Sequence, residues 1–349
     1  MKTLLKNARE KKGLKTREVA QILGIDQALI SKFENGTRKP TREQIPKLAS
    51  LLDINFETLM IAWLKEKILY EIGDDALALK AMKLAEEHIK CNTSFERKSI
   101  SKNLQKLLDE IDVLKKKLSD YRQLGNLKIY PGLELEYTFE SNRIEDNTLT
   151  LHETNLVINE GLTISGKSMR EHLEAINHHE AIGYIKQLTE RNFPLNEGEL
   201  LGIHNLILRG IISEDAGRYR KVQVMIKGNS HMPSQPSKIA KDMDDYFSWY
   251  ESNKTKIHPI ILAAEMHERL ATIHPFIDGN GRTSRLIMNL ILLQNGYVIA
   301  NIKGDYDTQM KYYHVLETAQ TSNNNEDFLL FIGQIEKESL ERYLKIISQ

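Results

Sequence analysis

The chain has 349 residues, enough for two or three domains, and its 48 basic and 48 acidic side chains leave no net charge that would indicate a partner. The single cysteine, Cys91, excludes an internal disulfide and is typical of a reducing compartment. No apolar run reaches the length of a membrane span, and the first residues lack the apolar stretch of a signal peptide, so we expect a soluble, cytoplasmic protein that binds no membrane.

The first 64 residues predict a basic module of four or five short helices. Residues 1–65 carry 13 lysines and arginines but only 7 aspartates and glutamates, a net charge of +6. Helical apolar spacing recurs along the module, and a Gly24-Ile25 turn between the second and third helices predicts a helix-turn-helix. The module resembles the Cro/repressor-type family, whose pattern is matched at Gly13-Leu14, Glu18-Val19-Ala20, Leu23-Gly24-Ile25, Ile30 to Gly36 and Pro40.

This resemblance implies that the third helix enters the major groove of double-stranded DNA. Gln27, Ala28 and Lys32 would then face base edges, whereas Thr16 and Arg38 would contact phosphates. A module that keeps the fold and binds protein instead is the alternative, because alanine reads bases poorly. Since one module reads only a short half-site, useful affinity for DNA would require a homodimer.

Residues 65–130 predict a helical, lysine-rich connector. Apolar residues follow three- and four-residue steps from Ile100 to Leu118, and Gln123 to Asn126 breaks the pattern. The favoured interpretation is a spacer packed on its neighbours. The alternative is a dimerisation helix that aligns two DNA readers, although its heptad is short and irregular.

Residues 131–349 predict a helical body with a single hairpin. Near the start of this body, Ser141 and Glu145 are four residues apart and share a helix face. Further on, alternating apolar residues and a following turn predict two short strands, at Val222, Val224 and Ile226 and beyond Gly228-Asn229.

Three histidines of this body lack a partner at metal-ligand spacing. We therefore expect His178 and His179 on a helix surface, and His231 on the hairpin or elsewhere on the surface.

The most informative stretch is His274-Pro275-Phe276-Ile277-Asp278-Gly279-Asn280-Gly281-Arg282-Thr283-Ser284-Arg285. Apolar runs on both sides predict a tight loop between two buried helices, with both arginines in the first turn of the second. A helix N-terminus attracts anions, glycines allow close approach of the backbone, and arginines three apart share a face. These features together suit a triphosphate, although no P-loop motif occurs in the chain.

Two further residue types in this stretch indicate chemistry. The carboxylate of Asp278 is a hard oxygen ligand that suits Mg²⁺. The imidazole of His274 has an ordinary pKa near neutrality, which makes it the natural general base.

The stretch matches H-P-F-x-[DE]-G-N-G-R-x-x-R at every fixed position and resembles the signature of the Fic family, with the resemblance covering roughly residues 135–335. It implies a protein adenylyltransferase that moves AMP from ATP to a serine, threonine or tyrosine hydroxyl of a target protein or of the chain itself. His274 would remove the hydroxyl proton, and Asp278 would hold Mg²⁺. The phosphates would be bound by Gly279, Asn280, Gly281, Arg282 and Arg285.

The resemblance also implies an inhibitory helix near residues 137–147, of the form [ST]-x-x-x-E-[GN], that begins at Ser141. Glu145 would pair with Arg285 and take the place that the γ-phosphate needs; an ordinary surface glutamate is the alternative. Asp146 stands where the family has glycine or asparagine, which is costly if that residue needs a positive φ.

Two more segments have counterparts in the family. The hairpin resembles a flap that binds a target segment as an added strand, through Val224, Met225, Ile226, Lys227 and Gly228. A helix near residues 309–320 would enclose the adenine through Tyr313, Leu316 and Gln320, and ordinary core packing is an equal alternative for these three.

We therefore expect a mainly α protein: a five-helix helix-turn-helix domain at residues 1–64, a helical connector at 65–130 and an all-α Fic domain with a short β-hairpin flap at 131–349. The predicted function is adenylylation restrained by Glu145 and coupled to a DNA-binding module. The alternatives are a transcriptional regulator in which the Fic domain is a sensor or a self-modifying switch, and transfer or removal of another phosphate-containing group.

Overall fold

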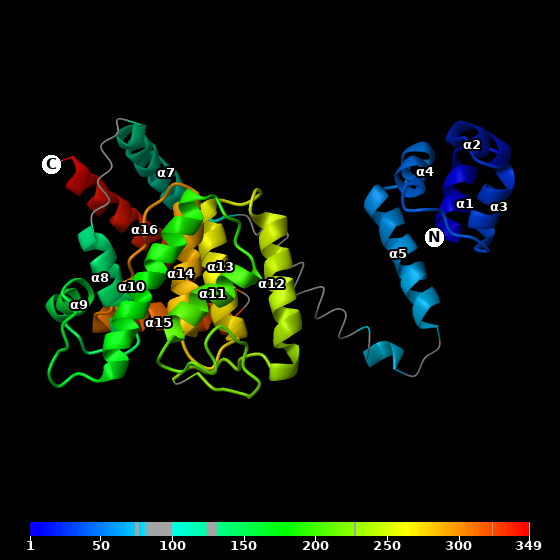
Figure 1. The fold of residues 1–349 in the computed structure, drawn as a ribbon. Helices are drawn as coiled ribbons and strands as arrows, with labels where there is room; N and C mark the ends of the chain where they lie inside the picture. The colour runs from blue at the N-terminus through cyan, green and yellow to red at the C-terminus, as the bar shows by residue number, and fades with distance from the viewer. Residues whose placement is uncertain are drawn as a thin grey trace. The chain divides into compact units, whose positions relative to one another are not determined.

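The structure is a computed structural model that describes residues 1–73, 77–80, 82, 100–123, 131–226, 228–322 and 324–348; Cys91 lies outside these residues. The chain divides into two compact units, residues 1–98 and 99–349 (Figure 1). The described residues form helices and loops and no β-strand. None of the described helices is long and apolar enough to cross a bilayer.

The first unit contains the five expected helices, α1 (Lys2–Lys11), α2 (Thr16–Leu23), α3 (Gln27–Asn35), α4 (Gln44–Leu52) and α5 (Phe56–Ile72). Left-handed glycines end α2 and α3, with φ of 64° at Gly24 and 78° at Gly36. Its core consists of buried side chains from all five helices, among them Leu5, Val19, Ile30, Phe33, Leu48, Leu59 and Trp63. This unit is therefore a small helical domain with a core of its own.

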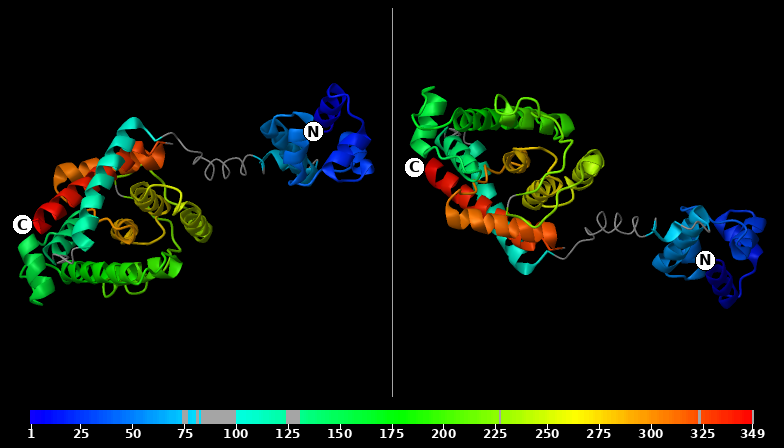
Figure 2. Two further views of the ribbon diagram at one scale, coloured as in Figure 1. Left: turned by 90° about the horizontal axis from the view of Figure 1, so that it is seen from above. Right: turned by 90° about the horizontal axis from the view of Figure 1, so that it is seen from below.

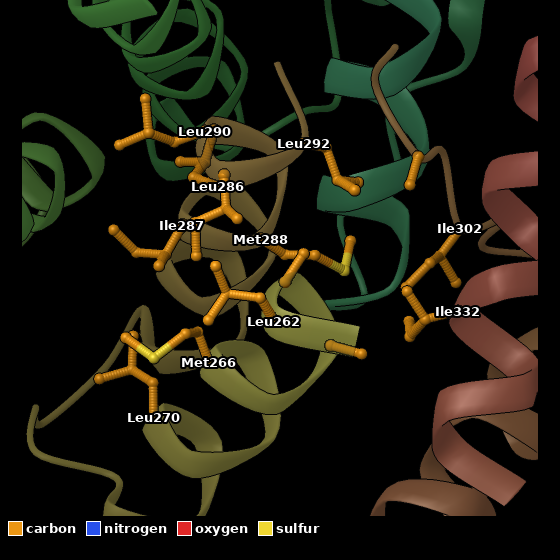
Figure 3. Packing of buried hydrophobic residues seen from close by; sticks show 14 of the residues in the cluster. Leu262, Met266, Leu270, Leu286, Ile287, Met288, Leu290, Leu292, Ile302 and Ile332 are labelled. Atoms are coloured by element: carbon orange, nitrogen blue, oxygen red, sulfur yellow. The ribbon is translucent and has the colours of Figure 1, made fainter. Parts of the chain in front are cut away.

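The second unit is built around two antiparallel helices, α13 (Pro259–Ile273) and α14 (Asn280–Gln294), that pack along each other. Figure 3 shows Leu262, Met266 and Leu270 of α13 beside the buried side chains of α14. In α14 every residue from Arg282 to Leu292 is buried. A helix that is buried on all sides must lie in the middle of the fold, so its N-terminus is held rigidly.

The other helices of this unit surround the central pair. Helices α10 (Met169–Glu190) and α11 (Glu197–Leu208) pack against α14, while α12 (Ile239–Asn253), α15 (Tyr306–Thr321) and α16 (Glu326–Ile347) pack against α13. Helix α8 (Pro131–Arg143) contacts α10 and α14, α9 (Leu151–Asn159) contacts α8 and α10, and a short 3₁₀ turn (Pro236–Lys238) precedes α12.

The described end of the connector belongs to this second unit. Helix α7 (Lys102–Gln123) packs along α16, as Figure 2 shows, and buries Leu104, Leu108 and Ile111 there. Its apolar face is thus used inside the unit, as the favoured interpretation expects. The expected domain boundaries at residues 64 and 130 stay predictions; the first falls within α5, and the second just before α8.

The expected β-hairpin is wrong for the described residues. Residues 221–226 and 228–235 run as irregular chain, and Lys227 lies outside the description. Side chains take the carbonyls that a strand ladder would use: the Gln223 amide donates to the Pro233 carbonyl at 3.1 Å. A two-stranded hairpin is marginally stable by itself, so an alternating pattern alone did not suffice to form one.

Candidate active site

The segment 274–285 forms the predicted loop between α13 and α14. His274 ends α13 in the left-handed conformation with φ of 53°, and Gly279 precedes α14 with φ of 76°. The side chain of Asn280 closes the loop, because its amide donates to the Phe276 carbonyl at 2.9 Å and its oxygen accepts from the Phe276 N–H at 3.0 Å. Asn280 is thereby committed to loop structure, and the N–H groups of the first turn of α14 remain the natural anion donors.

A histidine from outside the motif supports the same loop. The ring of His204, on α11, stacks on Phe276 with centroids 3.6 Å apart. Its Nε2 donates to the Asp278 carbonyl at 2.9 Å, and its Nδ1 accepts the Gly217 N–H at 3.0 Å. Burial lowers the pKa of His204 to about 4, so at neutral pH it is the uncharged tautomer that these two bonds require.

Arg282 lies in the first turn of α14 with unused hydrogen-bonding capacity. Its side chain is 2% exposed, and its Nη1 and Nη2 lie 3.4 Å from carboxylate oxygens of Glu174 and Asp278. Among the described residues, its Nε and Nη1 have no hydrogen-bond partner. Buried guanidinium donors without partners, next to a helix N-terminus, suit an anion such as a phosphate.

Asp278 is an ionised carboxylate between two arginines. Arg170 Nη2 donates to Oδ2 at 2.5 Å, and the Gly279 N–H donates to Oδ1 at 2.6 Å. Burial alone would raise its pKa, but the charges of Arg282 and Arg170 and the Gly279 hydrogen bond lower the pKa of Asp278 overall. Although the described residues contain no group of three side chains suited to a metal, one ionised carboxylate is enough for Mg²⁺ that is also bound by phosphates.

His274 is half-buried, and burial lowers its pKa to about 4. Its imidazole is therefore neutral at pH 7 and able to accept a proton. Arg220 Nε donates to the backbone carbonyl of His274 at 2.8 Å, which ties this residue to the segment before the expected flap.

The turn after α8 reaches into this site. Arg285 is 1% exposed, and its Nη2 donates to Glu145 Oε1 and to the Ser141 carbonyl, both at 2.8 Å. Its Nε donates to Ser141 Oγ at 3.0 Å. A Cβ at Gly281 would overlap the Glu145 carboxylate, so this carboxylate lies directly against the motif backbone.

Glu145 and Asp146 lie in a turn with a left-handed backbone at Asp146. Helix α8 ends at Arg143, so Glu145 lies in the following turn and not on the helix face as expected. Asp146 has φ of 65°, the left-handed region in which most side chains crowd the backbone. Asn147 then donates to Glu174 Oε2 at 2.9 Å, which anchors the turn on α10.

Comparison with known proteins assigns both units. Residues 194–292 match the model of the Fic/DOC family, and residues 5–59 match a helix-turn-helix family. The chain carries a Fic/DOC domain. The predicted resemblances, and the mainly helical fold with an N-terminal helix-turn-helix domain, are thereby confirmed.

Two relatives illustrate the similarity. The protein adenylyltransferase Fic of Nematostella vectensis is 33% identical over 247 residues, which cover 69% of this chain and 56% of the relative. That of Drosophila grimshawi is 34% identical over 210 residues, covering 60% and 42%. This chain thus spans about half the length of the curated relatives it matches.

Solved structures agree with this assignment. A Fic family protein from Desulfovibrio desulfuricans G20 is 28% identical, with a TM-score of 0.61 over 72% of this chain and 77% of that chain. Residues 134–508 of Fic-1 from C. elegans are 22% identical, with a TM-score of 0.62 over 95% and 97% of the two chains, and share the fold.

In the second unit, α15 lies against the turn that carries Glu145. The hydroxyl of Tyr313 donates to the Ile144 carbonyl at 2.8 Å, and the Gln309 amide donates to the same carbonyl at 2.7 Å. Gln320 accepts from Asn229 at 2.8 Å. Of the three residues expected to enclose adenine, Leu316 is buried in the core, Tyr313 is 40% exposed, and Gln320 is bonded to the expected flap.

The segment expected to be the flap is fastened at several points. Glu317 of α15 accepts from Ser230 N and Oγ at 2.8 and 2.7 Å. His231 Nε2 donates to the Thr272 carbonyl at 2.9 Å, so this histidine supports the segment and does not lie free on the surface. Val224 is half-buried, whereas Met225 is 79% exposed.

The expected DNA-reading residues lie together in the first unit. Gln27, Ala28 and Lys32 are exposed on α3, and Arg38 is exposed in the loop that follows. The Gln27 amide donates to Thr16 Oγ1 at 3.2 Å, so these two expected contact residues are neighbours. Asp26 caps α3 by accepting the Ala28 N–H at 2.7 Å, which gives this acidic residue a local structural task.

Sequence reasoning missed four residues of the second unit that support the site: Arg170, Glu174, His204 and Arg220. His204 and Glu174 could have been noticed as single polar residues within apolar helices, but such residues are often ordinary core positions. The expectation for His178 was wrong: it is fully buried on α10, beside Tyr137. Burial and the charges of Arg285 and Arg282 hold the pKa of His178 well below its ordinary value.

Proposed function

We propose that this protein is an adenylyltransferase that transfers AMP from ATP to a serine, threonine or tyrosine hydroxyl of a target protein or of itself. The observation that carries this proposal is the buried guanidinium of Arg282 beside the N-terminus of α14, whose Nε and Nη1 make no hydrogen bond to a described residue although Nη1 lies 3.4 Å from Glu174. The neutral imidazole of His274 at the other end of the same loop supplies the base. The names of the relatives support AMP as the transferred group.

The residues present fit Mg²⁺. Asp278 is ionised and 30% exposed, and its partner Arg170 is 52% exposed and also donates to Glu174 at 3.1 Å, so Arg170 keeps a carboxylate partner when Asp278 binds the metal. Mg²⁺ held by Asp278 would neutralise negative charge on the phosphates of ATP.

In the proposed reaction, His274 takes the proton from the target hydroxyl as its oxygen forms a bond to the α-phosphorus. The bond between the α-phosphorus and the oxygen bridging to the β-phosphate breaks, and pyrophosphate leaves. The backbone N–H of Gly281 and the side chain of Arg282 bind phosphate oxygens, and the Gly279 N–H does so once it leaves the Asp278 carboxylate. Arg285 receives the γ-phosphate. Positioning and charge stabilisation account for most of the rate enhancement.

Glu145 restrains this reaction in our proposal. Its carboxylate occupies Arg285 and lies against Gly281, in the region where the end of a triphosphate would be bound. ATP could then bind only in a geometry that does not favour transfer. Asp146 in its left-handed conformation adds local strain, which weakens this turn relative to one with glycine.

Replacement of the base tests the assignment. In a Glu145→Gly background, His274→Ala should reduce AMP transfer by about 10²–10⁴-fold while ATP binding, measured by calorimetry, is retained. Full transfer activity in the doubly substituted protein would exclude His274 as the base. Mass spectrometry of lysate proteins after incubation with ATP and Mg²⁺ would separate AMP from other phosphate-containing groups, and loss of a pre-installed AMP would indicate AMP removal.

We also propose that residues 1–64 bind double-stranded DNA. The match to a helix-turn-helix family and the exposure of Gln27, Ala28, Lys32 and Arg38 support this second function. A footprint on the promoter of the gene itself should show protection that weakens with salt, and Lys32→Ala should reduce it. If no duplex is protected at low salt, a protein-binding role replaces DNA binding. The homodimer and the cytoplasmic location remain predictions.

A further inference from the structure

Arg220 lies between the catalytic loop and the segment expected to be the flap. It follows Gly217, which has φ of 68° and packs closely on α11, where a Cβ would be 3.0 Å from the Leu201 carbonyl oxygen and from the Cβ of Asn205. This turn leads Arg220 into the interior, where it is 3% exposed.

All of the hydrogen bonds of the Arg220 side chain go to backbone carbonyls. Its Nε donates to His274 at 2.8 Å, its Nη1 to Val222 at 2.8 Å, and its Nη2 to Ser234 at 2.5 Å. Its own N–H donates to the Pro275 carbonyl at 2.9 Å. One side chain therefore joins the catalytic histidine to both ends of the segment 222–234.

Burial of the Arg220 guanidinium costs free energy, which its hydrogen bonds must offset. Among the residues that the structure describes, no carboxylate forms an ion pair with Arg220, and burial lowers the pKa of its guanidinium. A buried charge without a counter-charge needs hydrogen-bond partners, and here each of the three guanidinium nitrogens donates one hydrogen bond to a separate carbonyl. The planar guanidinium donates in fixed, divergent directions, which a lysine ammonium at the end of a flexible chain cannot reproduce.

The backbone of His274 makes such support useful. Its φ of 53° is a left-handed conformation, which is unfavourable for a residue with a side chain. The bond from Arg220 to the His274 carbonyl, with the bond to the Pro275 carbonyl, favours this backbone arrangement. The direction of the imidazole therefore depends on the same side chain that holds residues 222 and 234.

We propose that Arg220 is a positioning residue that fixes the base and the target-binding segment as one unit. An extended target segment bound along residues 222–226 would then present its hydroxyl at a constant place relative to the His274 ring. This inference rests on the proposed adenylyl transfer and assigns to Arg220 the alignment of its two reaction partners.

The test uses the full chain in a Glu145→Gly background and measures self-labelling with radiolabelled ATP. Arg220→Lys keeps the positive charge but loses the divergent donors. It should lower the labelling rate at saturating ATP by about 10²-fold, because small displacements of a base cost that much. The ATP concentration for half-maximal rate and the ATP affinity by calorimetry should change less than about twofold, since ATP contacts α14.

A second readout does not require activity. Hydrogen exchange of the backbone amides in residues 222–234 should become faster in Arg220→Lys, while exchange in α13 and α14 remains unchanged. Arg218→Lys is the matched control, because Arg218 is an exposed arginine two residues earlier in the same turn. It should match its parent in both measurements.

Three results would overturn the inference. The first is labelling by Arg220→Lys at the rate of its parent. The second is slower labelling with unchanged exchange in residues 222–234. The third is a parallel loss of ATP affinity and thermal stability, which would make Arg220 only a structural residue. If the Glu145→Gly parent binds ATP but labels nothing, adenylyl transfer fails, and the exchange data alone then decide whether Arg220 fixes the segment.

Discussion

At the scale of single residues, the arginines of the site are already paired with carboxylates. Arg285 is bonded to Glu145, and Arg170 and Arg282 both face Asp278. In each pair, the carboxylate or the arginine is the group that a nucleotide or its metal is proposed to bind. Ligand binding must therefore replace existing ion pairs, and the strength of those pairs sets the resting state of the site.

The pair between Arg170 and Asp278 gives the first prediction. Because an exposed ion pair contributes up to about 1 kcal/mol, Arg170→Ala should lower the Mg²⁺ concentration that half-saturates ATP binding by about two- to fivefold. Calorimetric titration of ATP at a series of Mg²⁺ concentrations measures this without any turnover. Arg209→Ala, which removes a comparably exposed arginine paired with Glu180, is the control and should leave the Mg²⁺ dependence unchanged. A higher Mg²⁺ requirement in Arg170→Ala would show that Arg170 assists the metal.

At the scale of elements, α15 holds the turn that carries Glu145. Tyr313 and Gln309 both donate to the Ile144 carbonyl, one residue before the inhibitory glutamate. Helix α15 thus connects the expected adenine site with the turn that carries Glu145. A movement of α15 on nucleotide binding would therefore change the hydrogen bonds that hold this turn. This connection concerns a backbone carbonyl, which no side-chain pattern in the sequence reveals.

The second prediction concerns that hydrogen bond. Tyr313→Phe keeps the ring but removes the donor, which should weaken the turn by about 1 kcal/mol and raise self-labelling about fivefold. The rate of label incorporation from ATP measures the effect, and Tyr306→Phe, at an exposed position on the same helix, should have no effect. A lower labelling rate in Tyr313→Phe would indicate that the hydroxyl serves nucleotide binding and not the turn.

The helices of this protein could be predicted from the sequence, whereas the hairpin prediction was wrong for the described residues and two supporting side chains were missed. Glycine positions and apolar spacing predicted the helices of the first unit and the loop between α13 and α14, because those signals are local. The hairpin expected near Val222 and Val224 is absent from the described residues, since Gln223 and Arg220 take carbonyls that a strand ladder would need. The sequence also left out the supporting roles of His204 and Arg220, because the bonds that tie them to the catalytic loop go to backbone carbonyls 74 and 54 residues away.

At the scale of the whole molecule, burial lowers the pKa of several histidines of the second unit, among them His178, His204, His267 and His274. Burial holds the pKa of His178 well below its ordinary value and lowers the pKa of His267 to about 3, and those of His204 and His274 to about 4. Below about pH 6.5 these histidines are protonated in the unfolded chain but stay neutral in the folded protein. The contribution of these histidines to stability is therefore present above about pH 6.5 and is lost as the pH falls toward 4.

The third prediction follows from this linkage. Each histidine contributes a loss of up to about 1.4 kcal/mol per pH unit in this window, so calorimetry should show a falling Tm between pH 7 and pH 4.5. Glu265 acts in the opposite sense, because burial raises its pKa to about 7 and makes folding easier in acid. Glu265→Gln should therefore steepen the decline. A Tm that is constant or rises over this range would contradict the assignment of neutral buried histidines.

The central claim is that ATP reacts at the loop between α13 and α14 when the Glu145 carboxylate is removed. The most direct test is the intact mass of the full chain after incubation with ATP and Mg²⁺, compared for the wild type, Glu145→Gly and the doubly substituted Glu145→Gly, His274→Ala protein. We expect an AMP adduct that is about tenfold or more abundant in Glu145→Gly than in the wild type and nearly absent from the double variant. A Glu145→Gly protein that binds ATP yet gains no AMP, on itself or on any added protein, would contradict the account.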